Sequence, residues 1–452
     1  MSRQFETVHR DESLAMTVRL GECLPPDHLV HCVVAIVAGL DLSALYAGYG
    51  SRGGKPYDPR VLLGLLVYGY ATGVFSSRKI ERATYESIPF RFIAGNRHPD
   101  HDTLAAFRRA FLPELKGLFA QVLLLAQEAG VVKLGTISLD GTKVHADASK
   151  RSAVSYKGLL ALEAQVRAEV EELFAMSERG EQGEAPDGLV VADEIGRRED
   201  LLARLATAKG VLEARAEERL AAEQAAYEAK LEARAEQERT TGRRPGGRPP
   251  APPTSGPADG DQYNFTDPES RIMKQSSTAG FEQSYNAQIA VDQATLLIVG
   301  ASLSNHPNVS REAEPTLAAI PAPLGMPQAA ALDAGYFGPA TLTACAQRGI
   351  EAYVATGRDP HHQTWQQRFG PLPTPPPEDA SAQVKMAYKL QTAAGKAIYA
   401  ARKRTVEPVI GIIKEVLGFR QFSLRGIVAA GGEWLLVCLA FNIKRLHALS
   451  WA

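Results

Sequence analysis

Cysteine is scarce in this sequence, and none of it forms a metal-binding pair. The 452 residues include 4 cysteines, which stand far apart and contain no Cys-x-x-Cys pair. This spacing excludes a disulfide framework and a structural zinc site of the usual kind. Scattered free cysteines suit a reducing compartment, so we expect a cytoplasmic protein.

Long apolar runs and a large net charge of either sign are also missing. The longest apolar run, Trp434 to Phe441, is too short to span a bilayer, and the polar first residues lack the apolar core of a signal peptide. We therefore expect no membrane partner. The formal net charge is −1, which gives no overall basic character. Lysine and arginine outnumber acidic residues after Ser381, however, so this end of the chain could meet a polyanion.

The first 130 residues carry helix signals. Asp58 followed by Pro59 predicts a helix start, because aspartate caps a helix and proline suits its first turn. Gly73 ends this helix, and the next one carries Arg78 and Lys79. A third helix, from about Asp102, carries Arg108. Short helices around a glycine turn suit a helix-turn-helix-like DNA-binding domain over 1–130, and an ordinary helical bundle with solvated charges explains the pattern equally well.

The middle of the chain predicts an insertion. Apolar residues step by threes and fours from Leu159 to Leu173, and a second helical block rich in Ala, Glu and Arg follows from about Ile195 to Arg239. We interpret residues 155–240 as a helical or coiled-coil arm that projects, dimerises or lies across a partner, with a plain solvated spacer as the alternative. Residues 241–262 are rich in proline and glycine and predict a flexible linker.

Strand patterns surround this insertion and predict an α/β fold. Strand-forming residues occupy Ile137–Leu139, Tyr285–Val291, Leu296–Leu303, Ala329–Leu332 and Ile350–Thr356. Their mixture of alternating and fully apolar runs, with helical segments between them, predicts a mixed sheet flanked by helices. A helix over 396–418 closes the pattern, with a buried stripe that begins at Val406.

Three carboxylates stand where these elements can present them. Asp140 follows the first strand, Asp333 ends the strand Ala329–Leu332, and Glu407 lies on the basic helix over 396–418. An acid on a buried strand is costly to ionise unless a cation compensates it, so Asp140 meets either a basic side chain or a metal. Three acids that converge would repel one another unless divalent cations neutralise them, and Mg²⁺ prefers such oxygen ligands.

Several stretches together resemble the DDE-type transposases of bacterial insertion sequences. The segments SLDGTKVHADASK, ALDAGYF and YAARKRTVEPVIGIIKEVLGFRQFSLRG resemble the three acid-bearing motifs of that family and place Asp140, Asp333 and Glu407. GKPYDPRVLLGLLVYGYATGVFSSRKIERA resembles its helical N-terminal domain, and EWLLVCLAFNIKRL is similar to its closing helix. One departure concerns the third motif. The family usually has three residues between its arginine and its glutamate, whereas Arg402 leaves four and only Lys403 restores the spacing.

The resemblance implies a ribonuclease H-like catalytic domain over 131–446 and a bacterial protein associated with the nucleoid. It implies cleavage at the inverted-repeat ends of a mobile element and transfer of the 3′ ends into target DNA, by a homodimer that uses Mg²⁺ or Mn²⁺, with two ions expected. Asp140, Asp333 and Glu407 would be the catalytic and metal-binding residues. The alternative is a transposase-derived protein that binds DNA without cutting it. Residues expected to contact DNA are Arg78, Lys79, Arg108, Tyr399, Arg402, Lys403 and Lys414.

Overall fold

The computed structural model describes residues 19–49, 56–178, 190–242, 246–275, 280–357, 372 and 374–450. They belong to two compact units. The first unit joins residues 1–145 to residues 285–452, and the second consists of residues 146–284. The helical N-terminal segment thus shares one unit with the C-terminal part of the chain.

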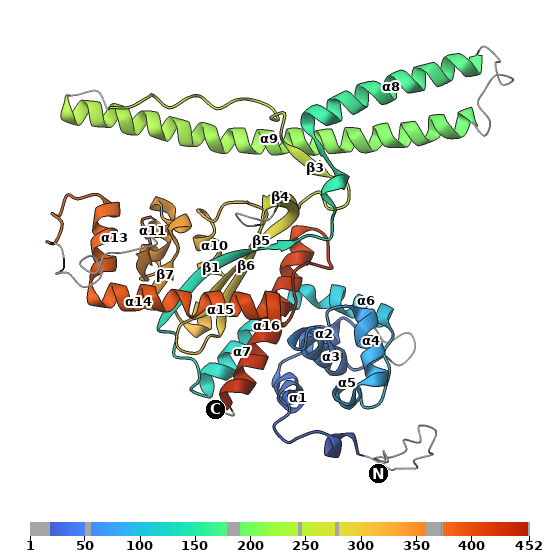
Figure 1. The fold of residues 1–452 in the computed structure, drawn as a ribbon, viewed down its shortest axis with the longest axis vertical. Helices are drawn as coiled ribbons and strands as arrows, with labels where there is room; N and C mark the ends of the chain where they lie inside the picture. Colours follow the sequence, from blue (N-terminus) through green and yellow to red (C-terminus); the bar gives the residue numbers. More distant parts are fainter. Residues whose placement is uncertain are drawn as a thin grey trace, which may run out of the picture. The chain divides into compact units, whose positions relative to one another are not determined.

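The first unit opens with helices, as predicted (Figure 1). α3 lies at the centre of this group, and nearly all its residues are buried because α1, α5, α6 and the C-terminal helix α16 (Ile427–Ser450) pack around it. The helices before the sheet are α1 (Leu29–Gly39), α2 (Ser43–Ala47), α3 (Pro59–Ala71), α4 (Ser77–Glu86), α5 (Ile88–Ile93), α6 (His101–Phe111) and α7 (Leu115–Glu128).

Local signals set where these helices begin and end. The Asp58 carboxylate accepts a hydrogen bond of 2.8 Å from the backbone N–H of Arg60, so the predicted cap before Pro59 is confirmed. Gly73 has a φ of 82°, and a Cβ there would lie 2.7 Å from the carbonyl oxygen of Leu417. Only glycine allows this turn and this close approach, which lets α4 begin immediately after α3.

A mixed sheet forms the rest of the core of the first unit. The neighbours run in the order β5-β1-β7-β8, and β6 pairs with the other edge of β5. β6 runs antiparallel to β5, whereas β7 is parallel to β1 and β8 is parallel to β7. The strands are β1 (Thr136–His145), β5 (Phe281–Asp292), β6 (Ile298–Ser304), β7 (Ala329–Leu332) and β8 (Glu351–Val354). The mixed sheet is confirmed, and β1 extends well beyond the predicted Ile137–Leu139.

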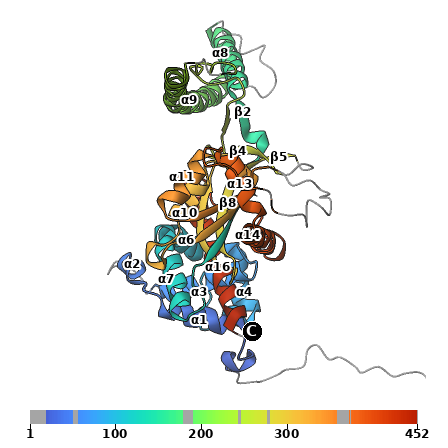
Figure 2. The ribbon, with the colours of Figure 1, turned by 90° about the vertical axis from the view of Figure 1, so that its left-hand side faces the viewer.

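Helices cover both sides of this sheet: α10 and α11 lie on one side and α14 on the other (Figure 2). α16 packs against β6 and also against α3 and α7, so it connects the sheet to the N-terminal helices. Asn442 of α16 fixes this contact by hydrogen bonds to both backbone groups of Ile298, at 2.8 and 2.7 Å. The helices are α10 (Ala313–Ala318), α11 (Pro339–Gln347), α13 (Ala382–Gln391), α14 (Ala393–Lys403), α15 (Val406–Gly411) and α16 (Ile427–Ser450).

The prediction of one continuous helix over 396–418 is wrong. α14 ends at Lys403, α15 begins at Val406, and a single π-helical turn follows over Ile412–Val416. The interruption lies at Thr405, whose hydroxyl bonds to the carbonyl oxygens of Ala401 and Arg402 instead of leaving the chain to continue as a helix.

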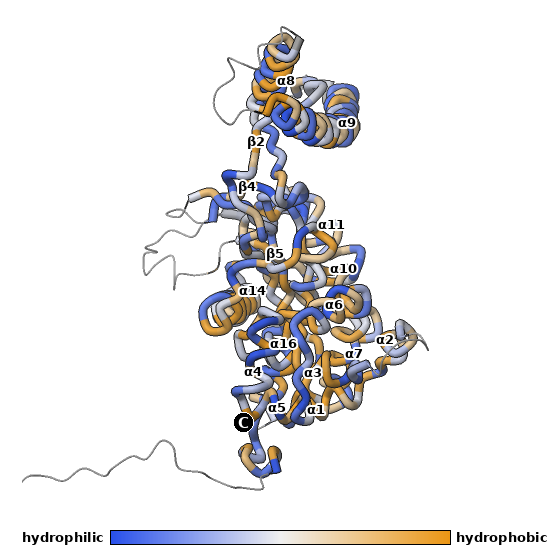
Figure 3. Tube along the Cα trace, turned by 90° about the vertical axis from the view of Figure 1, so that its right-hand side faces the viewer, coloured by the Kyte–Doolittle hydropathy of each residue, from blue (hydrophilic) through white to orange (hydrophobic). Residues whose placement is uncertain are grey.

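The second unit contains the predicted helical hairpin. α8 (Tyr156–Glu178) packs along α9 (Val191–Thr241), and much of α9 is hydrophilic (Figure 3). A small core centred on Leu159, Leu205 and Leu212 holds the two helices together at the end near β2 (Ala153–Ser155) and β3 (Gln262–Asn264), which pair antiparallel. β4 (Arg271–Lys274) pairs antiparallel with the first residues of β5. The described part of the predicted linker is bound to α9, because Arg219 contacts both Asp261 and the carbonyl oxygen of Gly256.

Two helical stretches of the described chain, 101–128 and 427–450, are long and apolar enough to cross a bilayer by composition alone. The second is α16, and 67% of its apolar window is buried inside the first unit. A core helix of this kind has the same composition as a membrane span, because it too is surrounded by apolar side chains.

Candidate functional site

Asp140 lies in the middle of β1, with its side chain 23% exposed. Its Oδ2 is 2.9 Å from Nη1 of Arg402, so of the two partners that the sequence allows, the structure provides the basic side chain. Burial raises the pKa of the Asp140 carboxyl above its ordinary value, and the Arg402 guanidinium offsets only part of that effect. The site therefore favours a second cation beside this carboxylate.

Asp333 reaches the same place through the register of the sheet. β7 runs parallel to β1, with Leu139 opposite Leu332, so the next residues of the two strands are Asp140 and Asp333. The two aspartates therefore lie side by side, Asp140 within β1 and Asp333 directly after the end of β7. The side chain of Asp333 is 52% exposed, and its Oδ1 is 3.7 Å from Nη2 of Arg402.

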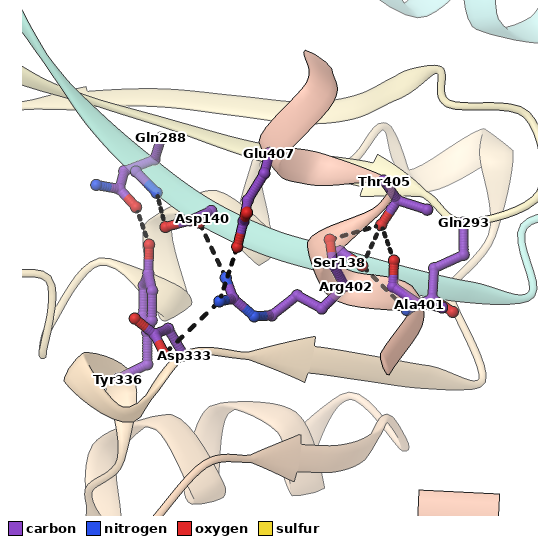
Figure 4. A network of polar contacts seen from close by, with 11 residues as sticks. Ser138, Asp140, Gln288, Gln293, Asp333, Tyr336, Ala401, Arg402, Thr405 and Glu407 are labelled. Carbon is purple, nitrogen blue, oxygen red and sulfur yellow. Dashed lines mark hydrogen bonds and ion pairs between the residues drawn. The ribbon is translucent and has the colours of Figure 1, made fainter. Parts of the chain in front are cut away.

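Glu407 completes the group from the first turn of α15. Its Oε1 is 3.4 Å from Nη2 of Arg402, and its side chain is 50% exposed. One guanidinium, itself only 6% exposed, therefore lies among three carboxylates from β1, β7 and α15 (Figure 4). The predicted convergence of the three acids is what the structure contains, and Arg402 rather than Lys403 is the basic residue at its centre.

The break between α14 and α15 explains how Arg402 reaches Glu407 although four residues separate them. In a continuous helix, residues five apart would point about 140° away from each other. The interruption at Thr405 turns Arg402 and Glu407 toward the same point. Thr405 is held there by its hydroxyl contact of 2.9 Å with Ser138, and Gln293 donates to Ser138 Oγ at 3.0 Å.

A row of buried polar side chains lies beside Asp140 and Gly141. Tyr336 donates a hydrogen bond to Oε1 of Gln288, and Gln288 donates to Oδ1 of Asn286 at 2.9 Å. All three residues are buried. Burial and the nearby charge of Asp140 raise the pKa of Tyr336 well above its ordinary value, so its hydroxyl stays a donor. The amide of Gln288 lies directly over the backbone of Gly141.

Replacing Gly141 by Ala should displace the side chain of Gln288 or the backbone next to Asp140. The added Cβ would lie 2.7 Å from Cδ of Gln288 and closer still to its Nε2, and Gln288 cannot withdraw without losing Tyr336 and Asn286. We expect a loss of about 1–3 kcal/mol in the free energy of unfolding, because the core becomes overpacked. Any activity that depends on the placement of Asp140 should fall by about 100-fold, as for a displacement near 1 Å.

Gly117→Ala is the matched control, measured by the same denaturant unfolding and activity assays. Gly117 lies on α7 with no atom within 4 Å of an added Cβ, so this substitution should leave stability equal or slightly raised. Equal behaviour of the two variants would contradict the role given to the Gly141–Gln288 contact.

The residues expected to contact DNA divide into three groups. Arg78 and Lys79 are exposed on α4, and Lys403 is exposed at the end of α14. Tyr399 is half-buried, with the guanidinium of Arg402 5.8 Å from its ring centre. Lys414 is also half-buried, because its ammonium bonds to Oγ1 of Thr142 and to the carbonyl oxygen of Lys143, and burial lowers its pKa.

The expectation for Arg108 is corrected by the structure. Its guanidinium is buried, donates to Tyr70 Oη at 2.9 Å and lies 3.8 Å from the buried carboxylate of Glu433. An arginine committed to partners inside the core cannot neutralise a phosphate at the surface. The neighbouring Arg109 is exposed.

The donor set of the three acids fits a hard divalent cation. Carboxylate oxygens are the ligands that Mg²⁺ and Mn²⁺ prefer, and the half exposure of Asp333 and Glu407 leaves their oxygens accessible. In the described part of the chain no three His, Cys, Asp or Glu side chains lie close enough to share one ion. Each of the three acids instead lies within 4 Å of the Arg402 guanidinium.

Sequence reasoning missed Tyr336, Gln288, Ser138, Gln293 and Thr405. Tyr336 stands three residues after Asp333, and Ser138 two residues before Asp140 on the same strand, so proximity to a predicted acid was the available signal. For Gln288 and Gln293 the sequence carries no signal of this kind, because both act through contacts distant along the chain.

Two family models match the chain. Residues 18–110 match the model described as Transposase domain (DUF772), and residues 375–447 match the model described as Transposase DDE domain. The second match includes Arg402, Glu407 and Lys414, whereas Asp140 and Asp333 lie outside it. No curated protein and no solved structure matches the chain.

Proposed function

The chain belongs to the DDE-type transposases of insertion sequences, and we propose that it cleaves DNA at the inverted-repeat ends of its element and transfers the 3′ ends into target DNA. The observation that carries this proposal is the convergence of Asp140, Asp333 and Glu407 on one point. Acids from two strands and one helix have no structural need to meet, since each costs free energy beside the others. Their shared position is what phosphoryl transfer with divalent cations requires.

The sheet supports a ribonuclease H-like core for this activity. β1, β5 and β6 lie side by side in sequence order, and β7 and β8 add parallel strands to the other edge of β1. Asp140 lies on the central strand β1, and Asp333 directly follows the neighbouring strand β7. The proposed catalytic domain spans 131–446, with the helical hairpin as its insertion.

Asp140, Asp333 and Glu407 would hold Mg²⁺ or Mn²⁺. When bound, a pair of such ions supplies an activated attacking hydroxyl and a stabilised leaving oxygen in an in-line displacement. The protein's own residues fix the geometry: the β1–β7 register positions the two aspartates, and the bonds of Thr405 hold Glu407 toward them. The Arg402 guanidinium lies within ion-pair distance of all three carboxylates and so holds them near one another.

DNA is the proposed partner, bound through exposed cations. Lys403 stands one residue beyond Arg402 and faces solvent, so it can neutralise a backbone phosphate beside the acids. Arg78 and Lys79 on α4 are suited to a second stretch of duplex. A homodimer would bring the two ends of the element together, and the α8–α9 hairpin is the candidate for that contact.

The test is a cleavage assay on duplex DNA that carries the matched inverted repeats flanking the gene. We expect strand nicking at the repeat ends when Mg²⁺ or Mn²⁺ is present, and none in a chelator. Equal nicking of DNA that lacks the repeats, or nicking that persists in the chelator, would contradict the proposal. Tight binding of repeat DNA without cleavage or divalent-ion binding would instead favour a transposase-derived DNA-binding protein.

A further inference from the structure

A cavity of about 650 Å³ opens in the first unit at the start of β1, away from the three acids. Thr136 and Gln293 form part of its wall, and Asp140 stands four residues further along the strand, a distance of about 13 Å. This volume is within the range of pockets for small ligands, about 300–1,000 Å³. The proposed cleavage chemistry assigns no ligand to this cavity.

Three cations line the cavity: Lys133 before β1, Arg404 after α14 and Arg445 on α16. Arg445 donates to the carbonyl oxygen of Thr295 at 2.7 Å. Lys133 and Arg404 are exposed, and the side chain of neither has a hydrogen-bond or ion-pair partner within the described ranges. Like charges that gather without partners repel one another, so their arrangement favours an anion between them.

The one carboxylate in the lining does not cancel this preference. Asp292 is 2% exposed. Its Oδ2 accepts hydrogen bonds from the backbone N–H and the hydroxyl of Thr295, at 2.9 and 2.7 Å. This carboxylate is therefore occupied by hydrogen bonds within the turn after β5. The side chains that remain to contact a ligand's charge are the three cations.

Backbone strain marks the same cavity. Leu134 and Leu296 both line it, and they have φ values of 39° and 65°. Asn96 is the one other non-glycine residue with positive φ in the described chain. Leucine in this conformation is a costly outlier, and such outliers concentrate at ligand sites. Val131 and the two leucines add an apolar wall beside the cations.

We propose that this cavity binds a phosphate group carried on a ligand of mononucleotide size, with Lys133, Arg404 and Arg445 around the phosphate and the leucines against the sugar or base. Such a phosphate has two sources, a free nucleotide or one unit of a DNA strand. Ala401 and Thr405 also line the cavity, and Thr405 bonds to the carbonyl oxygen of Arg402. Occupancy would therefore stabilise the helix break that positions Arg402.

The experiment is a titration of the full chain in a chelator, so that no cleavage occurs, with inorganic phosphate, dAMP and a short single-stranded DNA as separate probes. We expect the wild type to bind dAMP more tightly than inorganic phosphate, since the apolar wall contacts only the nucleotide. Lys133→Ala and Arg404→Ala should each weaken dAMP binding by about 10-fold, because each removes a charge-assisted contact. Arg404→Lys should retain most of the affinity.

The matched control is Lys116→Ala, which removes an exposed lysine from α7 outside the cavity. If a DNA strand is the source, the double variant Lys133→Ala/Arg404→Ala should also bind the oligonucleotide more weakly, with a salt dependence reduced by about one unit for each lost phosphate contact. Unchanged DNA binding with lost dAMP binding would identify the free nucleotide. Equal affinity of wild type and double variant for every probe would overturn the inference and leave the proposed cleavage activity untouched.

Discussion

DNA cleavage should fall by on the order of 10⁴-fold or more when Asp140 or Asp333 is replaced by Asn, or Glu407 by Gln, because removing one member of a catalytic group has effects of this size. Each substitution keeps the shape of the side chain and removes one charged oxygen ligand. The three losses should not add, since the acids act on the same ions. The measurement is the rate of nicking of inverted-repeat DNA at saturating Mg²⁺.

The same variants should still bind DNA, and that separates catalysis from folding. Glu415→Gln is a suitable control, since Glu415 is an exposed acid that pairs with Arg420. It should cleave at the wild-type rate. Cleavage retained in the Asp333→Asn variant would show that the convergence around Arg402 is not the catalytic centre.

The raised pKa of Asp140 also predicts how replacing this residue changes the stability of the fold. Folding raises that pKa, so the folded state holds the proton more tightly than the unfolded chain does. The neutral form therefore stabilises the fold, and this contribution is lost as the pH rises through the raised pKa. At neutral pH in a chelator, Asp140→Asn should consequently unfold at an equal or higher temperature than the wild type, although it cannot cleave.

The second large effect concerns folding: Arg108→Ala should lower the free energy of unfolding by about 3–5 kcal/mol, because it leaves a buried carboxylate without its cation. That carboxylate belongs to Glu433, which is fully buried and also accepts hydrogen bonds from Tyr70 Oη and the backbone N–H of Ser423, both at 2.8 Å. Denaturant unfolding of the full chain measures the change.

Arg109→Ala supplies the control, because Arg109 is the exposed neighbour on the same helix. It should change stability by less than about 0.5 kcal/mol. At a temperature where both variants are folded, the salt dependence of DNA binding should be the same for Arg108→Ala and the wild type. A reduced salt dependence with unchanged stability would restore Arg108 to the DNA-binding surface.

These two predictions illustrate what the sequence could and could not provide. Asp58 with Pro59, the strand Ala329–Leu332 and the helical hairpin were predicted from neighbouring residues, and local signals suffice for them because capping, alternation and helical spacing act within a few residues. Asp140, Asp333 and Glu407 were predicted from their places on the expected strands and helix and from motif resemblance, and the parallel register of β1 and β7 explains why the two aspartates meet.

The predictions that failed share one cause: the residue concerned contacts a partner that is distant along the chain. Glu433 lies 363 residues from Tyr70, to which it is bonded, so no local pattern could show that Arg108 faces this pair. The contact of Ser138 with Thr405 joins residues 267 apart, and it fixes the break in a helix that sequence periodicity extends without interruption. The exceptional spacing of Arg402 and Glu407 has an explanation only once that break is visible.

α16 sets a distance that matters for the proposed reaction. This helix packs on β6 and on α3, so one set of apolar side chains fixes the separation between the cations of α4 and the carboxylates. How many base pairs lie between the point where the duplex is held and the bond that breaks would then be decided by residues that never touch nucleic acid.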